Sequence, residues 1–136
     1  SAFAAAERPG LVQGLVLDSA YSTLLSGMMG WWRFLGGRVL AVLLAPTALL
    51  AAQLLGVNPL RVDVAAALRR ARVPTLLLHG EEDTLALPSE ARRNAEAAGE
   101  EVVWLASSGH SEGRWLHPER YFSALEAFLD RVAPVG

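Results

Sequence analysis

Hydrophobic residues in this chain gather in short continuous runs, and longer stretches of mixed or alanine-rich sequence separate those runs. A short apolar run between helix-breaking residues is typical of a strand buried on both faces of a sheet. We therefore expect three strands, at residues 11–17, 73–79 and 101–106. Each connection between them contains helical sequence, so the sheet should be parallel with right-handed crossovers. This order of elements predicts an α/β fold.

The predicted helices carry start and stop signals. They are expected at residues 1–8, 60–71, 88–98 and 118–132. Asp63 is a plausible N-cap for the second of these helices. Pro88 and Pro118 suit the first turns of the last two, and Gly99 suits the end of the third. These helices would cover the faces of the sheet.

The segment from Leu24 to Val57 is the most apolar part of the chain. From Val39 onward it has the length and apolar character of a candidate membrane span, but Pro46 and Gln53 interrupt it. We expect instead a pair of short helices hinged at Ala45–Pro46, forming a lid over a site at the edge of the sheet.

Aromatic residues in the lid segment would supply an apolar ceiling for a substrate pocket. Trp31, Trp32 and Phe34 lie there, next to the pair Met28–Met29. The same residues are equally consistent with ordinary core packing. Binding of the apolar lid to a membrane interface is a further alternative.

Composition narrows the classes of function. A chain of 136 residues that is 52% hydrophobic and 19% charged fits one globular domain. The net charge of −2 gives no reason to expect nucleic acid as a partner. Cysteine is absent, which excludes disulfides and thiolate chemistry. The sequence has no metal-binding H-E-x-x-H motif and no glycine-rich phosphate loop, so no cofactor is predicted.

Two polar residues follow predicted strands at points where chemistry is common. Asp83 lies just past the strand at 73–79, and His110 follows the strand at 101–106 after a Ser-Ser-Gly turn. Since the carboxyl ends of parallel strands meet at one edge of a sheet, we expect these side chains to lie within about 2.6–3.2 Å of each other. A carboxylate in that place orients a histidine that acts as a general base. Taken singly, each could also be an ordinary turn or surface residue.

Other polar residues have simpler interpretations. Asp18 also follows a strand and competes with Asp83 for the role of acid, although a turn residue that accepts backbone N–H groups is the interpretation we favour. His79 is expected to be a structural histidine bonded to backbone, and His117 is expected to cap a helix. Ser1 has Phe3 rather than glycine two positions later, so we interpret it as an ordinary helix residue rather than a nucleophile.

The order of these motifs resembles the C-terminal half of an α/β-hydrolase. The motifs that carry the resemblance are Leu17-Asp18-Ser19 with Tyr21-Ser22, the HGEED segment within residues 74–88, Ser108-Gly109-His110, and His117-Pro118-Glu119-Arg120-Tyr121. The resemblance covers nearly all of the chain and is strongest to small bacterial hydrolases grouped with serine aminopeptidases and dienelactone-hydrolase-like esterases. The G-x-S-x-G nucleophile elbow of that family is absent.

The resemblance implies a partial α/β-hydrolase fold with a helical cap at about residues 24–60. It implies that Asp83 orients His110, which serves a serine lying a few residues before Ser1, in the hydrolysis of a small-molecule ester or amide. The chain would be the C-terminal portion of one domain and inactive alone. The strand at 11–17 would have an open edge, which an oligomer or a second segment would complete.

A different class of function is also consistent with the sequence. The chain would then be a non-catalytic module that binds a membrane surface or a protein partner through residues 24–57. No signal peptide is visible, so the expected location is the cytoplasm, either free or at the membrane periphery.

Overall fold

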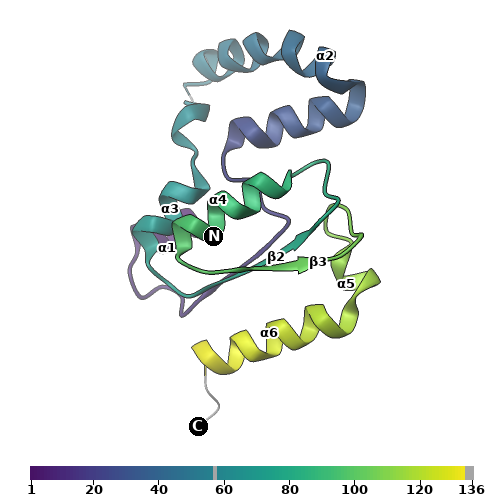
Figure 1. The fold of residues 1–136 in the computed structure, drawn as a ribbon. Coiled ribbons are helices and arrows are strands. Elements are labelled where there is room, and N and C mark those ends of the chain that lie inside the picture. The colour runs from purple at the N-terminus through teal and green to yellow at the C-terminus, as the bar shows by residue number, and fades with distance from the viewer. Residues whose placement is uncertain (57, 134–136) are drawn as a thin grey trace.

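The structure, a computed structural model, describes residues 1–56 and 58–133 (Figure 1). In these residues the sheet is parallel and has the order β1-β2-β3, with β2 in the centre. Its strands are β1 (Leu15–Asp18), β2 (Thr75–Gly80) and β3 (Val102–Leu105). The predicted parallel sheet is therefore confirmed. Val57, the last residue of the predicted apolar segment, lies outside the described residues.

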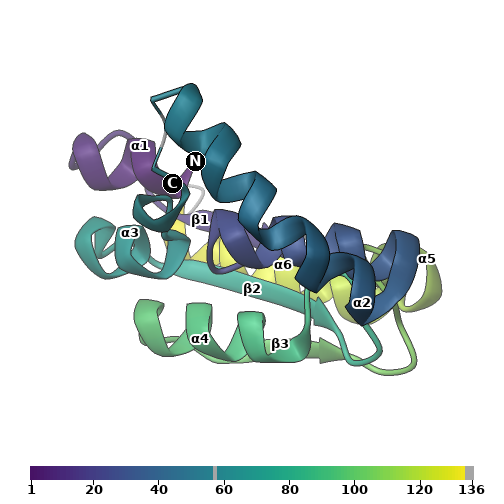
Figure 2. The same ribbon diagram turned by 90° about the horizontal axis from the view of Figure 1, so that it is seen from above.

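Helices cover both faces of the sheet, and a long helical segment stands away from it (Figures 1 and 2). One face carries α1 (Ala2–Glu7), α3 (Val64–Ala71) and α4 (Pro88–Ala98). The other face carries α6 (Pro118–Val132), which follows the short α5 (Gly113–Leu116). The segment that stands away is α2 (Leu24–Leu54), and the 3₁₀ turn η1 (Pro59–Arg61) follows it.

The central strand divides the core into two clusters. Successive side chains of a strand point to opposite faces of its sheet. Leu77 accordingly packs in the cluster under α1, α3 and α4, whereas Leu76 and Leu78 pack with Phe128 of α6. All six residues of β2 are buried. The predicted strand at 73–79 is thus the centre of the molecule.

Two predicted elements begin four residues later than expected. β1 begins at Leu15 rather than Leu11, because its ladder starts where the Leu15 N–H donates to the Pro74 carbonyl, and Pro74 has no N–H with which to continue it. The helix expected from Leu60 is broken before α3. There the Val64 N–H bonds to the Ser22 carbonyl instead of continuing a helix. Asp63 caps α3 as predicted, accepting from the Ala66 N–H.

The expected hinge at Ala45–Pro46 is wrong. α2 bends at Gly36 and Gly37 instead, where Gly37 has a φ of 72° in the region that favours glycine. Pro46 lies inside the helical segment that follows the bend. We call residues 24–35 the first arm and residues 38–54 the second arm. Figure 1 shows the second arm folding back over the first.

The start of α2 is attached to the residues that follow η1. The Leu24 N–H donates to the Val62 carbonyl over 2.9 Å, and Thr23 and Asp63 form an isolated antiparallel bridge. Thr23 and Ser26 also form a capping box at the start of the first arm. α2 is therefore a helical hairpin, and the chain that contains it leaves the body of the molecule at Thr23 and returns to it beside that residue at Asp63.

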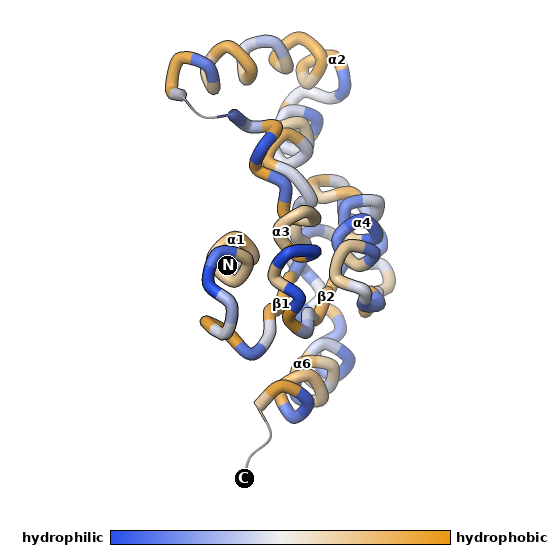
Figure 3. Tube along the Cα trace, turned by 90° about the vertical axis from the view of Figure 1, so that its left-hand side faces the viewer, coloured by the Kyte–Doolittle hydropathy of each residue, from blue (hydrophilic) through white to orange (hydrophobic). Residues whose placement is uncertain are grey.

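The hairpin is apolar and largely uncovered. Figure 3 shows its hydrophobic residues on the part of the chain farthest from the sheet. By length and composition alone α2 is a candidate membrane span. An 18-residue stretch of it has a mean hydropathy of 1.9, and only 11% of that stretch is buried in the molecule. α2 is therefore not a core helix.

Candidate active site

The loops that follow β2 and β3 are joined by their backbones. The Glu81 N–H donates to the Leu105 carbonyl and the Glu82 N–H to the Ser108 carbonyl, each over 3.0 Å. Gly80 makes this approach possible, because a Cβ at that position would overlap the carbonyl oxygen of Ser108. The two loops predicted to carry the site therefore meet at the carboxyl edge of the sheet.

Asp83 and His110 are hydrogen-bonded to each other. His110 Nδ1 lies 2.9 Å from Asp83 Oδ2, within the range predicted from the sequence, so that expectation is confirmed. The other carboxylate oxygen of Asp83 accepts the N–H groups of Leu85 and Ala86, each over 2.9 Å. Asp83 is 2% exposed, whereas 32% of the His110 side chain is accessible. A fixed, buried carboxylate therefore orients a histidine that opens to solvent.

His79 has the structural role predicted for it. Its Nε2 lies 2.9 Å from the Ala86 carbonyl oxygen, and His79 is fully buried in β2. Because a carbonyl only accepts, this nitrogen carries the proton. His79 Nε2 is 3.7 Å from Asp83 Oδ2, which is too long for a hydrogen bond. His79 thus supports the loop of Asp83 without competing for its carboxylate.

The loop of His110 is held on both sides of the histidine. The Gly109 N–H donates to Glu112 Oε2 over 2.8 Å, and the Ser111 N–H donates to Ser19 Oγ over 2.9 Å. Ser19 lies just after β1 and is buried. Sequence reasoning missed this role of Ser19, which was singled out only as part of a motif after the first strand.

Tyr21 lies against His110, with ring centroids 5.9 Å apart. Burial raises its pKa, and the negative charge of Asp83 raises it further. Gly27 and Gly30 of the first arm pack close to the ring, and a Cβ at Gly30 would also overlap the Leu85 carbonyl oxygen. The first arm of α2 therefore rests on both Tyr21 and the loop of Asp83.

A pocket of about 570 Å³ shares Tyr21 with this region. Its other walls are mainly apolar and come from α1, β1, the first arm and the start of α3; they include Phe3, Leu17, Leu24, Met28, Trp31 and Val64. Of the predicted ceiling residues, Met28 and Trp31 line this pocket. The other three, Met29, Trp32 and Phe34, are not among its lining residues. The bend after Leu35 directs the chain away from the sheet.

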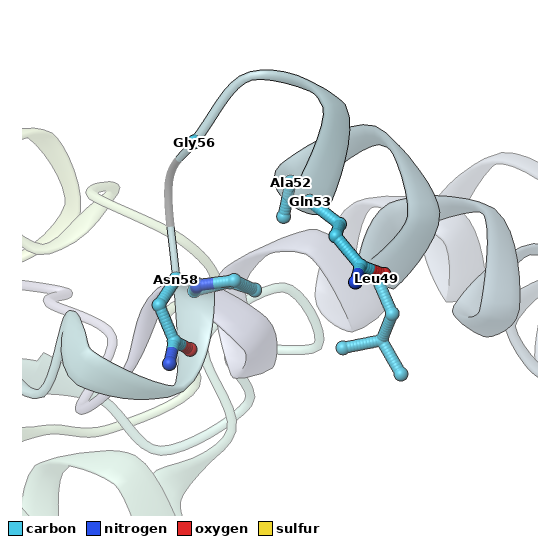
Figure 4. A pocket seen from close by; sticks show the side chains of 6 residues that line it. Leu49, Ala52, Gln53, Gly56 and Asn58 are labelled. Atoms are coloured by element: carbon cyan, nitrogen blue, oxygen red, sulfur yellow. The ribbon is translucent and has the colours of Figure 1, made fainter.

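A second pocket, of about 430 Å³, lies between the second arm and η1 (Figure 4). Leu49 and Gln53 of the arm face Asn58 across it. None of its lining residues belongs to the loops of Asp83 or His110. It is therefore not part of the candidate active site.

The remaining candidates bond elsewhere. Asp18 Oδ2 accepts from the Tyr121 hydroxyl over 3.1 Å, so it contacts a side chain of α6 rather than the backbone N–H groups expected of a turn. Burial and the charge of Asp18 together raise the pKa of Tyr121. His117 stands at the N-cap position of α6, but its side chain bonds to the Ala106 carbonyl and caps no N–H. Ser1 precedes α1 and lines the larger pocket.

A polar cluster fastens the base of the hairpin to α4. Glu90 Oε2 accepts from the N–H and hydroxyl of Ser22 and from the hydroxyl of Ser26. Burial alone would raise the pKa of Glu90, but these hydrogen bonds and the charge of Arg93 outweigh it and lower the pKa. Arg93 also pairs with Asp63 over 2.7 Å.

In the described residues, no group of three or more His, Asp or Glu side chains could hold a metal ion.

Solved structures of known proteins share this arrangement of elements. No model of a protein family matches the chain, and no curated protein matches it. MGS-MChE2, an α/β hydrolase enzyme from the metagenome of lagoon sediments of Mar Chica, Morocco, is 20% identical and superposes with a TM-score of 0.61 over 96% of this chain and 55% of its own. An esterase of Pyrococcus furiosus is 20% identical, with a TM-score of 0.66 over 96% of this chain and 49% of its own.

A third similar structure is CarC, a serine hydrolase involved in carbazole degradation. It is 17% identical, with a TM-score of 0.59 over 96% of this chain and 58% of its own. The fold is that of the α/β-hydrolases. The chain spans about half the length of these proteins. At sequence identities this low, the similarity establishes the fold alone.

Proposed function

We propose that this chain supplies the acid and the base of a serine hydrolase that cleaves ester or amide bonds. Asp83 holds the His110 ring in the tautomer that carries its proton on Nδ1. His110 Nε2 then takes the proton of a serine hydroxyl as that oxygen attacks the substrate carbonyl. The same nitrogen returns the proton to the departing alcohol or amine, and water releases the acyl group from the serine.

The hydrogen bond between Asp83 and His110 is the observation that carries this proposal. A carboxylate with one oxygen fixed by two backbone N–H groups and the other on a histidine is suited to stabilise the imidazolium that forms during acyl transfer. The partial exposure of the His110 side chain supports the access of a nucleophile and a substrate to this histidine. The α/β-hydrolase fold of the chain supports the same assignment.

The serine is proposed to lie on a segment outside this sequence. Among residues 1–56 and 58–133, no serine hydroxyl is hydrogen-bonded to His110. In the same residues β1 pairs with β2 alone, so its other edge is open to a further strand. We infer that this strand carries the nucleophile elbow and that residues 24–60 form a cap of the completed domain.

A fluorophosphonate probe, which labels activated serines, tests the proposal. The isolated chain should remain unlabelled. A longer form that includes any residues encoded upstream of Ser1 should be labelled and should hydrolyse p-nitrophenyl esters. In that form His110→Gln should lower the rate by at least 10²-fold, and Asp83→Asn should do the same.

Two controls make the result specific. His117→Gln and Asp18→Asn remove a histidine and a carboxylate that lie outside the proposed pair and should retain most of the activity. Labelling of a serine within the isolated chain would contradict the proposal. Full activity of the Asp83→Asn variant in the longer form would contradict it too, because the acid would then lie elsewhere.

A further inference from the structure

The hairpin α2 exposes large apolar side chains on both of its arms. Exposed residues of this kind on α2 and just after it are Leu24, Trp31, Phe34, Leu35, Val39, Val42, Leu43, Leu49, Leu50, Leu54 and Leu55. A soluble monomer seldom exposes so much continuous apolar surface without using it for association. Figure 3 shows that the second arm of the hairpin, which carries most of these residues, is the part of the chain farthest from α6.

The charge of the segment is one-sided. From Ser19 to Val62 the chain has no aspartate or glutamate, although carboxylates outnumber basic residues in the chain as a whole. The basic residues of the segment are Arg33, Arg38 and Arg61, and the first two flank the bend at Gly36–Gly37. An apolar surface with only positive charges matches a membrane whose lipid headgroups are negative.

The attachment of the hairpin decides how it would meet a membrane. A span needs about 20 apolar residues in one direction and leaves its ends on opposite sides of the bilayer. The bend divides α2 into two shorter arms, and the chain before α2 meets the chain after η1 at the bridge between Thr23 and Asp63, so both return to the same side. The hairpin is therefore suited to lie in the interface and not to cross the bilayer.

We propose that the α2 hairpin binds the surface of an anionic lipid membrane, with the second arm in the boundary between headgroups and acyl chains. Val42, Leu43 and Leu50 are the anchoring side chains. Arg33 and Arg38 contact lipid phosphates near the bend. This proposal does not depend on the catalytic one, because no part of it requires Asp83 or His110.

Vesicle flotation of the full chain tests the proposal. The chain should float with vesicles of phosphatidylcholine and phosphatidylglycerol in a 7:3 ratio (about 30% anionic lipid, in the range where surface charge attracts basic residues). Its partition coefficient should fall at least tenfold on pure phosphatidylcholine, and also when Val42, Leu43 and Leu50 are all replaced by serine. Replacing Arg33 and Arg38 by glutamine should remove most of the preference for the anionic vesicles.

Three exposed apolar residues outside the hairpin provide a matched control. Leu11, Phe122 and Leu129 are 48–50% exposed, against 60–67% for the anchoring residues. The triple serine variant of these positions should float as well as the unaltered chain. Circular dichroism of each variant establishes that it is folded, so that loss of flotation reports on binding.

A site-specific probe measures insertion directly and avoids the triple variant. The chain has no cysteine, so Leu50→Cys and Leu129→Cys each provide one position for an environment-sensitive dye. The emission of the dye at position 50 should shift to the blue with anionic vesicles, and that at position 129 should not. Equal shifts at both positions would overturn the proposal. So would a dimer without lipid whose position 50 is already shielded from a soluble quencher, since a second copy would then cover the hairpin.

Discussion

The backbone N–H of Ser111 donates to Ser19 Oγ over 2.9 Å, which joins the loop after β1 to the residue beside His110. Ser19→Ala removes the acceptor and leaves this N–H without a partner. We expect the free energy of unfolding to fall by about 1–2 kcal/mol. Hydrogen exchange at the Ser111 amide should become faster than in the unaltered chain. Exchange of the β2 amides should change only as much as the lower free energy of unfolding requires.

Ser89→Ala is the control for that prediction. Ser89 is an exposed serine in the first turn of α4. Its replacement is the same serine-to-alanine change, made at a position outside the loop of His110. An unchanged exchange rate at Ser111 in the Ser19→Ala chain would mean that the hydrogen bond does not hold this loop.

Gly80→Ala should separate the two loops of the candidate site. The new Cβ would overlap the carbonyl oxygens of Ser108 and Gly109, and those are backbone atoms that cannot move without shifting the loop. We expect a loss of about 2–3 kcal/mol in the free energy of unfolding, measured with urea.

Gly99→Ala gives the comparison for Gly80. Gly99 has a φ of 71° and open space around it, so alanine there meets only backbone strain of about 1 kcal/mol. If the two variants were equally stable, steric contact between the loops would not be the reason for glycine at position 80.

Asp83→Asn should change the tautomer of His110 more than it changes stability. The amide oxygen can still accept from the Leu85 and Ala86 N–H groups, but the amide nitrogen would face His110 Nδ1 and donate to it. The proton of the neutral ring should therefore move from Nδ1 to Nε2. Nitrogen-15 chemical shifts of the imidazole measure this directly, and Glu82→Gln, at an exposed position of the same loop, should leave them unchanged.

Acid should weaken the attachment of the hairpin through Glu90. Hydrogen bonds from Ser22 and Ser26 and the charge of Arg93 outweigh the effect of burial, so the pKa of Glu90 in the folded chain lies below the ordinary 4.5. Between those two pKa values the unfolded chain binds more protons than the folded chain, so stability rises with pH. The contribution is complete above about pH 4.5 and disappears as the pH falls through the folded pKa.

Glu90→Gln isolates this contribution. At pH 7 the variant should be less stable by about 1–2 kcal/mol, because its amide accepts hydrogen bonds more weakly than a carboxylate. The gap should narrow as the pH falls below about 4.5 in urea unfolding experiments. Glu126→Gln, at an exposed position of α6, should show no such convergence. A gap independent of pH would mean that the charge of Glu90 does not stabilise the fold.

Local patterns in the sequence predict much of this fold. Apolar runs between breakers identify β2 and β3, and the residues that follow them, Asp83 and His110, meet as expected because parallel strands end at one edge. The position of His79 in a buried strand likewise indicates its bond to backbone. These features depend mainly on residues that are near one another in the chain.

Features that depend on tertiary contacts were missed. The hinge was expected at Pro46, the residue with the stronger local signal, but a proline within an exposed helix is accommodated and the bend uses the positive φ of Gly37. The bonds of Ser19 and of Glu90 join residues far apart in sequence, so no local pattern reveals them. The late start of α3 has the same origin, since the Val64 N–H donates to the carbonyl of Ser22, which is distant in sequence.

The bridge between Thr23 and Asp63 has a consequence for how this protein can vary. The segment that contains the hairpin departs and re-enters at adjoining residues, so the second arm can lengthen, shorten or change composition while Ser22 and Val64 keep their separation. The first arm is constrained differently, because Gly30 packs against Tyr21 and the Leu85 carbonyl. Substitutions in residues 38–54 should therefore leave the pair of Asp83 and His110 undisturbed, whereas substitutions in the first arm should not.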